Sequence, residues 1–284
     1  MLRHLTGLNH SIVACLDLEA ARATFEQLGF CLTPRGAHAS RGTANYCIMF
    51  SNTNYIELLG FSGEVRSEAE PLLMEQLTSG EGIAAVAFDS DDGKALWNEL
   101  AAVGVMATKP SVGERDFQVA GQREIVRFEI LRLPVEATPG LRTFICRHLD
   151  PLVVYHPDFR NHDNTAYRIK AVTLMVDNPM AIARPYETLL GKPVVAEGCL
   201  AYETGNCLLR LATSAWIEQY LWSGCTNQAS SPGCFVTVGV RDLAYAEKLA
   251  ADRGFAVRPM GPRQLVENTD RTCGVGLIYE NVTG

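Results

Sequence analysis

Short apolar runs recur along the chain, and each precedes a segment in which apolar residues return every three or four positions. The first run, LNHSIVAC, begins at residue 8 and is typical of a buried strand. In the amphipathic segment after it, Asp17 can cap a helix and Gly29 can end it. Further strand-like stretches follow, FCLTP, NYCIMF and NYIELLGF. Residues 7–61 are therefore predicted to form one β-α-β-β-β unit.

The same order of elements returns three times. The three further units lie at residues 82–133, 168–213 and 234–280. The twelve-residue spacing from Asp17 to Gly29 is repeated from Asp242 to Gly254. Self-similarity of this kind is the sequence signature of a repeated architecture. We therefore predict an α+β chain built from four β-α-β-β-β units.

The units group into two pairs, separated by a polar and aromatic segment at residues 147–167 that carries three of the six histidines. We predict an N-terminal domain at 1–146 and a C-terminal domain at 168–284. The segment between them is either a linker or a loop that contributes to a site, since site residues often lie on such connections.

The composition narrows the class of protein. Hydrophobic residues make up 47% of the chain and charged residues 20%, as in a globular protein with a full core. The net charge is −7 and no run of Lys or Arg exceeds two residues, which argues against nucleic acid or an anionic membrane as a partner. No apolar run approaches the roughly 18–20 residues that span a bilayer, and the nine cysteines form no CxxC pair. These features predict a reduced, cytoplasmic protein.

Two polar residues interrupt apolar strands of the first unit. His10 lies in LNHSIVA and Glu57 lies in YIELLGF, which are the first and last strands of that unit. An imidazole or a carboxylate on a buried strand is costly unless it is paired or bound to something. The pair is therefore the leading candidate for a functional site.

Several segments carry a family resemblance: LNH at 8–10, RGAHASRGTAN at 35–45, YIELLGF at 55–61 and NHDNTAYRIKAVTLMVDNP at 161–179. With these the chain resembles the glyoxalase-like domain family of the vicinal oxygen chelate superfamily, which also includes bleomycin-resistance proteins and dioxygenases. The family commonly reads His-Pro-Asn-Gly where this chain has His162-Asp163-Asn164-Thr165. The resemblance implies that paired units form curled mixed sheets around clefts.

The resemblance also implies a metal site, in which two units each supply ligands from their first and fourth strands. His10 and Glu57 match one half of such a set, and Glu280 is the best distant carboxylate, with Glu129 as the second candidate. These residues would hold one divalent ion such as Fe, Mn, Zn or Ni. The other half is missing, because Phe235 stands where His10 would align. A metal-free cleft, in which His10 bonds to Glu57 or to a backbone carbonyl, is the alternative.

The other candidate residues would contact a ligand. His38, Arg41, Thr43 and Asn45 lie in a glycine-containing loop that matches the family, and Arg41 suits a carboxylate or phosphate. His162 and Asn164 lie in the second matching motif, where a structural role is an equal alternative. No role is assigned to His148.

Two functions remain open for the N-terminal cleft, with a small molecule as the partner in both. One is a divalent-metal-dependent lyase, isomerase or dioxygenase acting on a small oxygenated metabolite, with Glu57 moving a proton. The other is a metal-free binding protein of the bleomycin-resistance type. The C-terminal half, with Arg210 or Leu209 where Glu57 would align, is expected to be a packing scaffold. A homodimer is compatible with either function.

Overall fold

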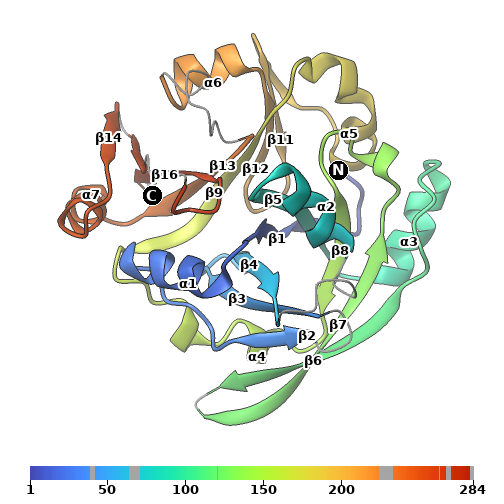
Figure 1. Ribbon diagram of the computed structural model, residues 1–284. Coiled ribbons are helices and arrows are strands. Elements are labelled where there is room, and N and C mark those ends of the chain that lie inside the picture. Colours follow the sequence, from blue (N-terminus) through green and yellow to red (C-terminus); the bar gives the residue numbers. More distant parts are fainter. Residues whose placement is uncertain are drawn as a thin grey trace.

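The structure is a computed structural model, and it describes residues 1–38, 42–63, 71–119, 121–223, 233–261, 263–266 and 270–281. Figure 1 shows two curled sheets with helices on their outer sides. The strands of the first half form one eight-stranded sheet and those of the second half form another. The predicted α+β class with four repeated units and curled mixed sheets is confirmed.

Each sheet contains two units in tandem. The first unit comprises β1 (Leu5–Ala14), α1 (Leu18–Gln27), β2 (Gly36–His38), β3 (Thr43–Met49) and β4 (Tyr55–Phe61). After α2 (Pro71–Ser79), the second comprises β5 (Gly82–Ser90), α3 (Gly93–Ala102), β6 (Ser111–Val119), β7 (Gln122–Arg132) and β8 (Thr143–His148).

The second half repeats this order after the short helix α4 (Pro151–Val154). The third unit comprises β9 (Ala166–Met175), α5 (Ala183–Leu190), β10 (Val194–Ala196), β11 (Cys199–Glu203) and β12 (Leu208–Ala212), and α6 (Ser214–Tyr220) follows it. The fourth comprises β13 (Cys234–Val240), α7 (Leu243–Asp252), β14 (Val257–Met260), β15 (Arg263–Val266) and β16 (Gly276–Asn281).

The two sheets share one strand order. The first runs β2-β3-β4-β1-β5-β8-β7-β6 and the second runs β10-β11-β12-β9-β13-β16-β15-β14. In the first sheet, β1 pairs in parallel with β4 and antiparallel with β5. The first strands of two units therefore meet at the centre of each sheet, and the first and fourth strands of each unit lie side by side.

Three helices begin at an aspartate, and two of these, Asp17 and Asp242, are the residues of the repeated spacing. Asp17, Asp92 and Asp242 each accept a hydrogen bond from the backbone N–H three residues later. Such caps satisfy N–H groups that have no partner within the helix. Gly29 follows α1 with a φ of 86°, in the left-handed region that glycine adopts without strain. The twelve-residue spacing therefore marks real helix boundaries.

The second unit extends further than the sequence indicated. Its fourth strand is β8, which ends at His148 and crosses the expected domain boundary at residue 146. The stretch before β8 contains Pro134 and Pro139 and includes a 3-10 turn at Val135–Ala137. Proline disrupts strand periodicity, and the apolar pattern of the second unit is therefore broken between β7 and β8.

The segment between the halves packs onto the first unit. The ring of His162 accepts a hydrogen bond from the backbone N–H of Cys31 (3.0 Å) and donates one to the carbonyl of Met49 (2.9 Å). The side chain of Asn164 donates to the carbonyl of Leu28 (2.8 Å). These bonds tie the connection to the end of α1 and to β3.

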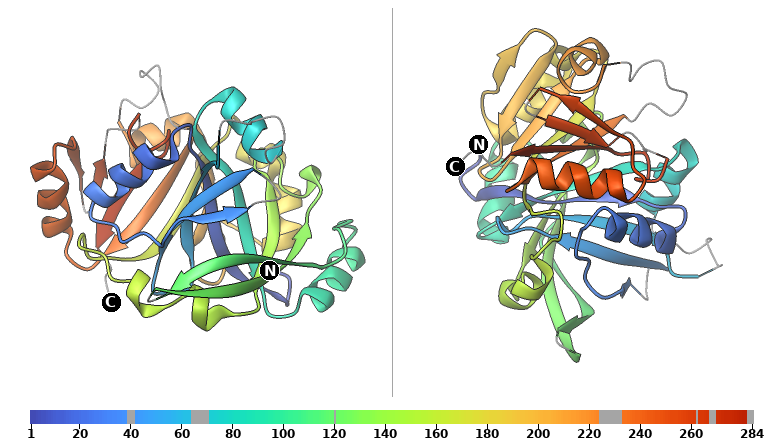
Figure 2. Two further views of the ribbon diagram at one scale, coloured as in Figure 1. Left: turned by 60° about the horizontal axis from the view of Figure 1, so that its bottom comes forward. Right: turned by 90° about the vertical axis from the view of Figure 1, so that its left-hand side faces the viewer.

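The two halves also share packing. The largest cluster of buried side chains includes residues of both sheets, and α1 and α7 lie side by side in Figure 2. Arg253, just after α7, donates to the carbonyl of Gln27 at the end of α1 (3.0 Å). Across the described parts of the chain, every helix is too short or too polar to cross a membrane.

Candidate active site in the N-terminal sheet

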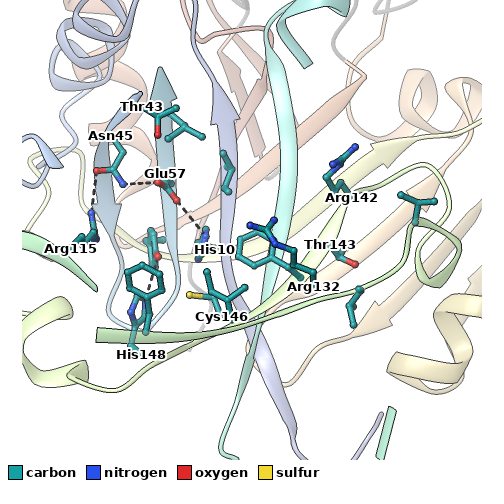
Figure 3. Close-up of a pocket in the computed structure, with 18 residues that line it drawn as sticks. His10, Thr43, Asn45, Glu57, Arg115, Arg132, Arg142, Thr143, Cys146 and His148 are labelled. Atoms are coloured by element: carbon teal, nitrogen blue, oxygen red, sulfur yellow. Dashed lines mark hydrogen bonds and ion pairs between the residues drawn. The ribbon is translucent and has the colours of Figure 1, made fainter. Parts of the chain in front are cut away.

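The concave face of the first sheet holds a pocket with about 1040 Å³ of empty space, part of which is open to solvent. Its walls come from β1, β3 and β4 on one side and from β6, β7 and β8 on the other (Figure 3). Both units of the N-terminal half thus contribute to one site.

His10 and Glu57 meet in this pocket. Tyr55 is the parallel partner of His10 across β1 and β4, and Glu57 projects from the same face of β4 two residues later. His10 is 3% exposed and Glu57 is 7% exposed. The Nε2 atom of His10 lies 3.4 Å from Oε2 of Glu57. The sequence prediction that these two residues face one cleft is therefore supported by their geometry.

A buried arginine stands behind the carboxylate. Asn45 on β3 donates a hydrogen bond to Oε1 of Glu57 (2.6 Å), and Arg115 on β6 donates to the amide oxygen of Asn45 (3.1 Å). Arg115 is 8% exposed. Burial acts to lower the pKa of this guanidinium, but its neighbours, Glu57 among them, raise that pKa on balance. The pocket therefore contains a fixed positive charge next to its carboxylate.

The hydrogen bonds around His10 assign its tautomer. The amide of Asn9 donates to Asp89 and to the hydroxyl of Tyr155 (3.4 Å), so its oxygen faces His10. That oxygen lies 2.7 Å from Nδ1 of His10, which must therefore carry the proton. Burial lowers the pKa of His10 to about 4, although Glu57 opposes the shift. The neutral ring presents a bare Nε2 to the carboxylate.

Two acceptor atoms thus face each other across 3.4 Å. A lone pair and a carboxylate oxygen repel unless a proton or a cation lies between them. A proton or a cation that enters this gap would remove the repulsion between the two atoms.

Tyr55 and His148 complete the polar end. The ring of Tyr55 stacks on His10 with 4.4 Å between centroids, and its hydroxyl lies 3.2 Å from Nε2 of His148. Burial, with smaller contributions from His10 and Arg115, lowers the pKa of His148 to about 3. Its buried Nδ1 atom has no hydrogen-bond partner among the described residues. His148 is therefore a neutral ring that borders the pocket beside Tyr55.

Residues 8–218 match the family model described as "Glyoxalase-like domain". The chain belongs to the glyoxalase-like domain family. This membership agrees with the resemblance inferred from the motifs, and it places the chain in the vicinal oxygen chelate superfamily. No curated protein sequence matches the chain.

Solved structures share the fold of this glyoxalase-like protein. A hypothetical protein from Staphylococcus aureus has a TM-score of 0.68 at 14% identity, covering 97% of this chain and 99% of that one. The Mn(II)-bound glyoxalase from Novosphingobium aromaticivorans has a TM-score of 0.55 at 12% identity, covering 97% and 82%. A xylose isomerase-like TIM barrel/4-hydroxyphenylpyruvate dioxygenase fusion protein has a TM-score of 0.60 at 13% identity, covering 99% and 49%.

Membership of this superfamily raises the question of a divalent metal. His10 and Glu57 suit two ligands, because a 3.4 Å separation fits two atoms bound to one ion at about 2.0–2.2 Å. A catalytic metal ordinarily has three protein ligands. Among the described residues, no three His, Cys, Asp or Glu side chains lie close enough together to hold a metal. The donor set is therefore two ligands, one short of a catalytic centre.

The second unit explains the missing ligand. Its helix cap Asp92 corresponds to Asp17, so Ala85 occupies the position of His10 on β5. The pairing of β5 with β8 then puts Phe144 at the position of Glu57. Neither side chain can bind a metal.

The structure does not bring Glu280 to His10 and Glu57. Glu280 lies on β16 of the other sheet, where it pairs with Lys170 (2.9 Å) and Arg263 (3.4 Å). The pairing of β13 with β16 puts Ile278, two residues earlier, at the position of Glu57.

Glu129, the second candidate ligand, also stays out of the pocket. Its carboxylate packs against Gly93 at the start of α3, and it lies 3.8 Å from Arg147. Its neighbours on β7, Phe128 and Ile130, line the pocket instead.

Only some of the predicted ligand-binding residues lie at the pocket. Thr43 and Asn45 line the pocket, and His38 pairs with Thr43 through the backbone of the β2–β3 ladder. Arg41 lies outside the described residues. His162 and Asn164 do not line this pocket but anchor the connection described above.

Sequence reasoning missed Arg115 and His148. Arg115 lies on the exposed hairpin strand β6, whose alternation of polar residues gave no sign of a buried member. His148 was missed because β8 was not recognised as the fourth strand of the second unit. The signal for His148 is its position on the strand of the second unit that corresponds to β4.

Proposed function

We propose that this glyoxalase-like protein is a lyase or isomerase that transfers a proton on a small oxygenated metabolite in the N-terminal pocket. The observation that carries the proposal is a buried carboxylate, Glu57, held between the bare Nε2 of His10 and an Asn45–Arg115 pair. Such a group lies within reach of a bound molecule because it lines the pocket.

The chemistry follows from the charges around Glu57. Its carboxylate would accept a proton from a carbon next to a substrate carbonyl, as a general base. Electron density would then move to the carbonyl oxygen, where a fixed positive charge in a water-poor site stabilises it. Arg115 provides that charge, and His10 can relay the proton through Nε2.

We assign no step to a metal, since the described residues offer two ligands and oxygen-activating iron sites use at least three. For the same reason we favour a lyase or isomerase over a dioxygenase. Elemental analysis of protein expressed in metal-replete medium should find well below one metal ion per chain. One ion per chain, lost on His10→Ala, would contradict this assignment.

The second candidate is a metal-free binding protein. Arg115, Asn45 and Glu57 already form hydrogen bonds with one another. This arrangement favours the second candidate, because it suits a rigid binding surface. Tyr55 and Phe144 provide aromatic faces for a ligand.

The exchange of carbon-bound hydrogen for deuterium distinguishes the two. We would incubate the protein in D₂O with a panel of small 2-oxo acids, aldehydes and ketones and follow their C–H signals by NMR. Wild-type protein should accelerate the exchange for at least one compound, and Glu57→Gln should lose roughly 10²- to 10⁴-fold of that rate. Glu280→Gln, the matched control, should keep the full rate. Binding without exchange would support the second candidate and overturn the first.

A further inference from the structure

The pocket has the opposite charge to the protein that contains it. The chain has a net charge of −7, yet the pocket is lined by three arginines and one carboxylate. Burial lowers the pKa of both lining histidines, His10 and His148, so they add no charge at neutral pH. A cleft of one sign concentrates ligands of the other sign. The excess charge therefore selects for anions.

The three arginines differ in what already pairs with them. Arg115 is buried and bonds to Asn45, and Arg142 forms an ion pair with Glu75. Arg132, at the end of β7, is an exposed residue that lines the pocket, and no described residue forms an ion pair with it. The backbone N–H of Arg132 donates a hydrogen bond to Oγ1 of Thr108 (2.9 Å), which fixes the end of the strand. Figure 3 shows the Arg132 side chain extending from β7 into the pocket, on the side away from Asn45 and Arg115.

Apolar side chains share the pocket with these charges. Five of them are Ile12, Leu59, Phe128, Ile130 and Phe144. The site thus offers a guanidinium at one end, a polar acid–base group at the other and an apolar wall. A ligand that fits has an anionic group, a short apolar body and an oxygenated carbon.

We propose that Arg132 binds the carboxylate or phosphate of a small organic acid, and so sets the substrate class of the pocket. This inference rests on the proposed use of the pocket as a small-molecule site. A guanidinium binds either anion through two parallel N–H donors, which a single ammonium cannot reproduce.

Binding of three related probes tests the proposal. Benzoate and phenyl phosphate carry the two anionic groups on an apolar ring, and benzamide is the neutral analogue of benzoate. The dissociation constants would be measured by NMR titration. At least one anion should bind with a tenfold or greater advantage over benzamide, and the preferred anion identifies the group. Equal binding of benzamide, or no binding of either anion, would overturn the proposal.

Variants of Arg132 test whether this residue binds the anion. Arg132→Gln should raise the dissociation constant of the preferred anion by roughly 10- to 100-fold, since it removes charge-assisted hydrogen bonds. Arg132→Lys should recover part of the loss. Arg123→Gln, an exposed arginine on the same strand that pairs with Asp116, should change nothing. Anion binding that is unaffected by Arg132→Gln would contradict the assignment.

The binding experiment is independent of catalysis. If anions bind through Arg132 but no hydrogen exchange occurs, then the proposed reaction fails and the anion site stands. If exchange occurs and depends on Glu57 while Arg132→Gln binds normally, then the anion site fails and the proposed reaction stands.

Discussion

The two sheets have the same strand order, but different side chains occupy their concave faces. In the N-terminal sheet the equivalent positions hold His10, Glu57, Ala85 and Phe144, and all of these except Ala85 line the pocket. In the C-terminal sheet they hold Ala171, Arg210, Phe235 and Ile278. Phe235 and Ile278 pack with the fully buried Trp222 in one apolar cluster.

This difference shows how a repeated fold separates scaffold from site. The register of the first and fourth strands fixes which positions face the cleft in every unit. The residue types at those positions then decide between a polar pocket and a hydrophobic core. One polar pair was kept in the first unit, whereas the fourth unit uses the same two positions for packing.

The largest stability effect should come from the packed cleft. Trp222→Ala should lower the free energy of unfolding by about 3–5 kcal/mol, because it leaves a large cavity among Phe235, Ile278 and their neighbours. Phe144→Ala should cost clearly less, since this half-buried ring already borders the open pocket. Urea unfolding of both variants measures the difference.

Trp222→Phe serves as the control. The indole N–H of Trp222 is buried without a partner among the described residues, so removing it saves an unpaired donor and offsets part of the lost packing. Equal losses for Trp222→Ala and Phe144→Ala would show that the two clefts are packed alike, against the comparison.

Acid should destabilise the N-terminal half first, because no histidine follows His162 in the chain. Burial lowers the pKa of His162 from 6.5 to about 4. A group with a lowered folded pKa stabilises the fold above its unfolded pKa, and this stability is lost as the pH falls from about 6.5 through 4. The loss for His162 alone is about 3 kcal/mol.

Hydrogen exchange at a series of pH values locates this loss. Protection should fall in β1, β3 and α1 at a higher pH than in β11 and β12 of the C-terminal sheet. His162→Gln, which cannot titrate, should remove the His162 share of the pH dependence of unfolding between pH 6.5 and 4 and leave the shares of His10 and His148. Uniform loss of protection across both sheets would contradict the expected order.

The smallest effect should come from Glu280. Lys170 and Arg263 hold the pKa of this carboxyl below its usual value, in opposition to the effect of burial. The carboxylate remains partly exposed, and ion pairs near the surface contribute about 1 kcal/mol or less. Glu280→Gln should therefore change the midpoint of urea unfolding only slightly. A loss of several kcal/mol would show that this charge cluster organises the C-terminal sheet.

Local sequence signals were enough to predict the fold. Aspartate caps, closing glycines such as Gly29 and apolar strands act over a few residues, and they predicted four units in the correct order. The pairing of His10 with Glu57 followed from the repeat, because the first and fourth strands of a unit are neighbours.

The rest of the site depends on contacts that no local pattern encodes. Arg115 reaches the pocket from a hairpin strand 58 positions beyond Glu57 in the chain, and only sheet curvature brings the two together. Glu280 was aligned with Glu57 by the shape of its motif, whereas the β13–β16 register places Ile278 there. A shift of two residues along a strand leaves the side chain on the same face of the sheet but moves it to another position along the cleft.

The most direct test of the central claim is to locate a bound ligand by NMR of isoleucine methyl groups. Ile12 and Ile130 line the N-terminal pocket, and Ile278 lies in the packed C-terminal cluster. Titration with benzoate or phenyl phosphate should shift the methyl signals of Ile12 and Ile130 and leave that of Ile278 unchanged. A saturable shift of Ile278, with Ile12 and Ile130 unaffected, would contradict the assignment of the site to the N-terminal sheet.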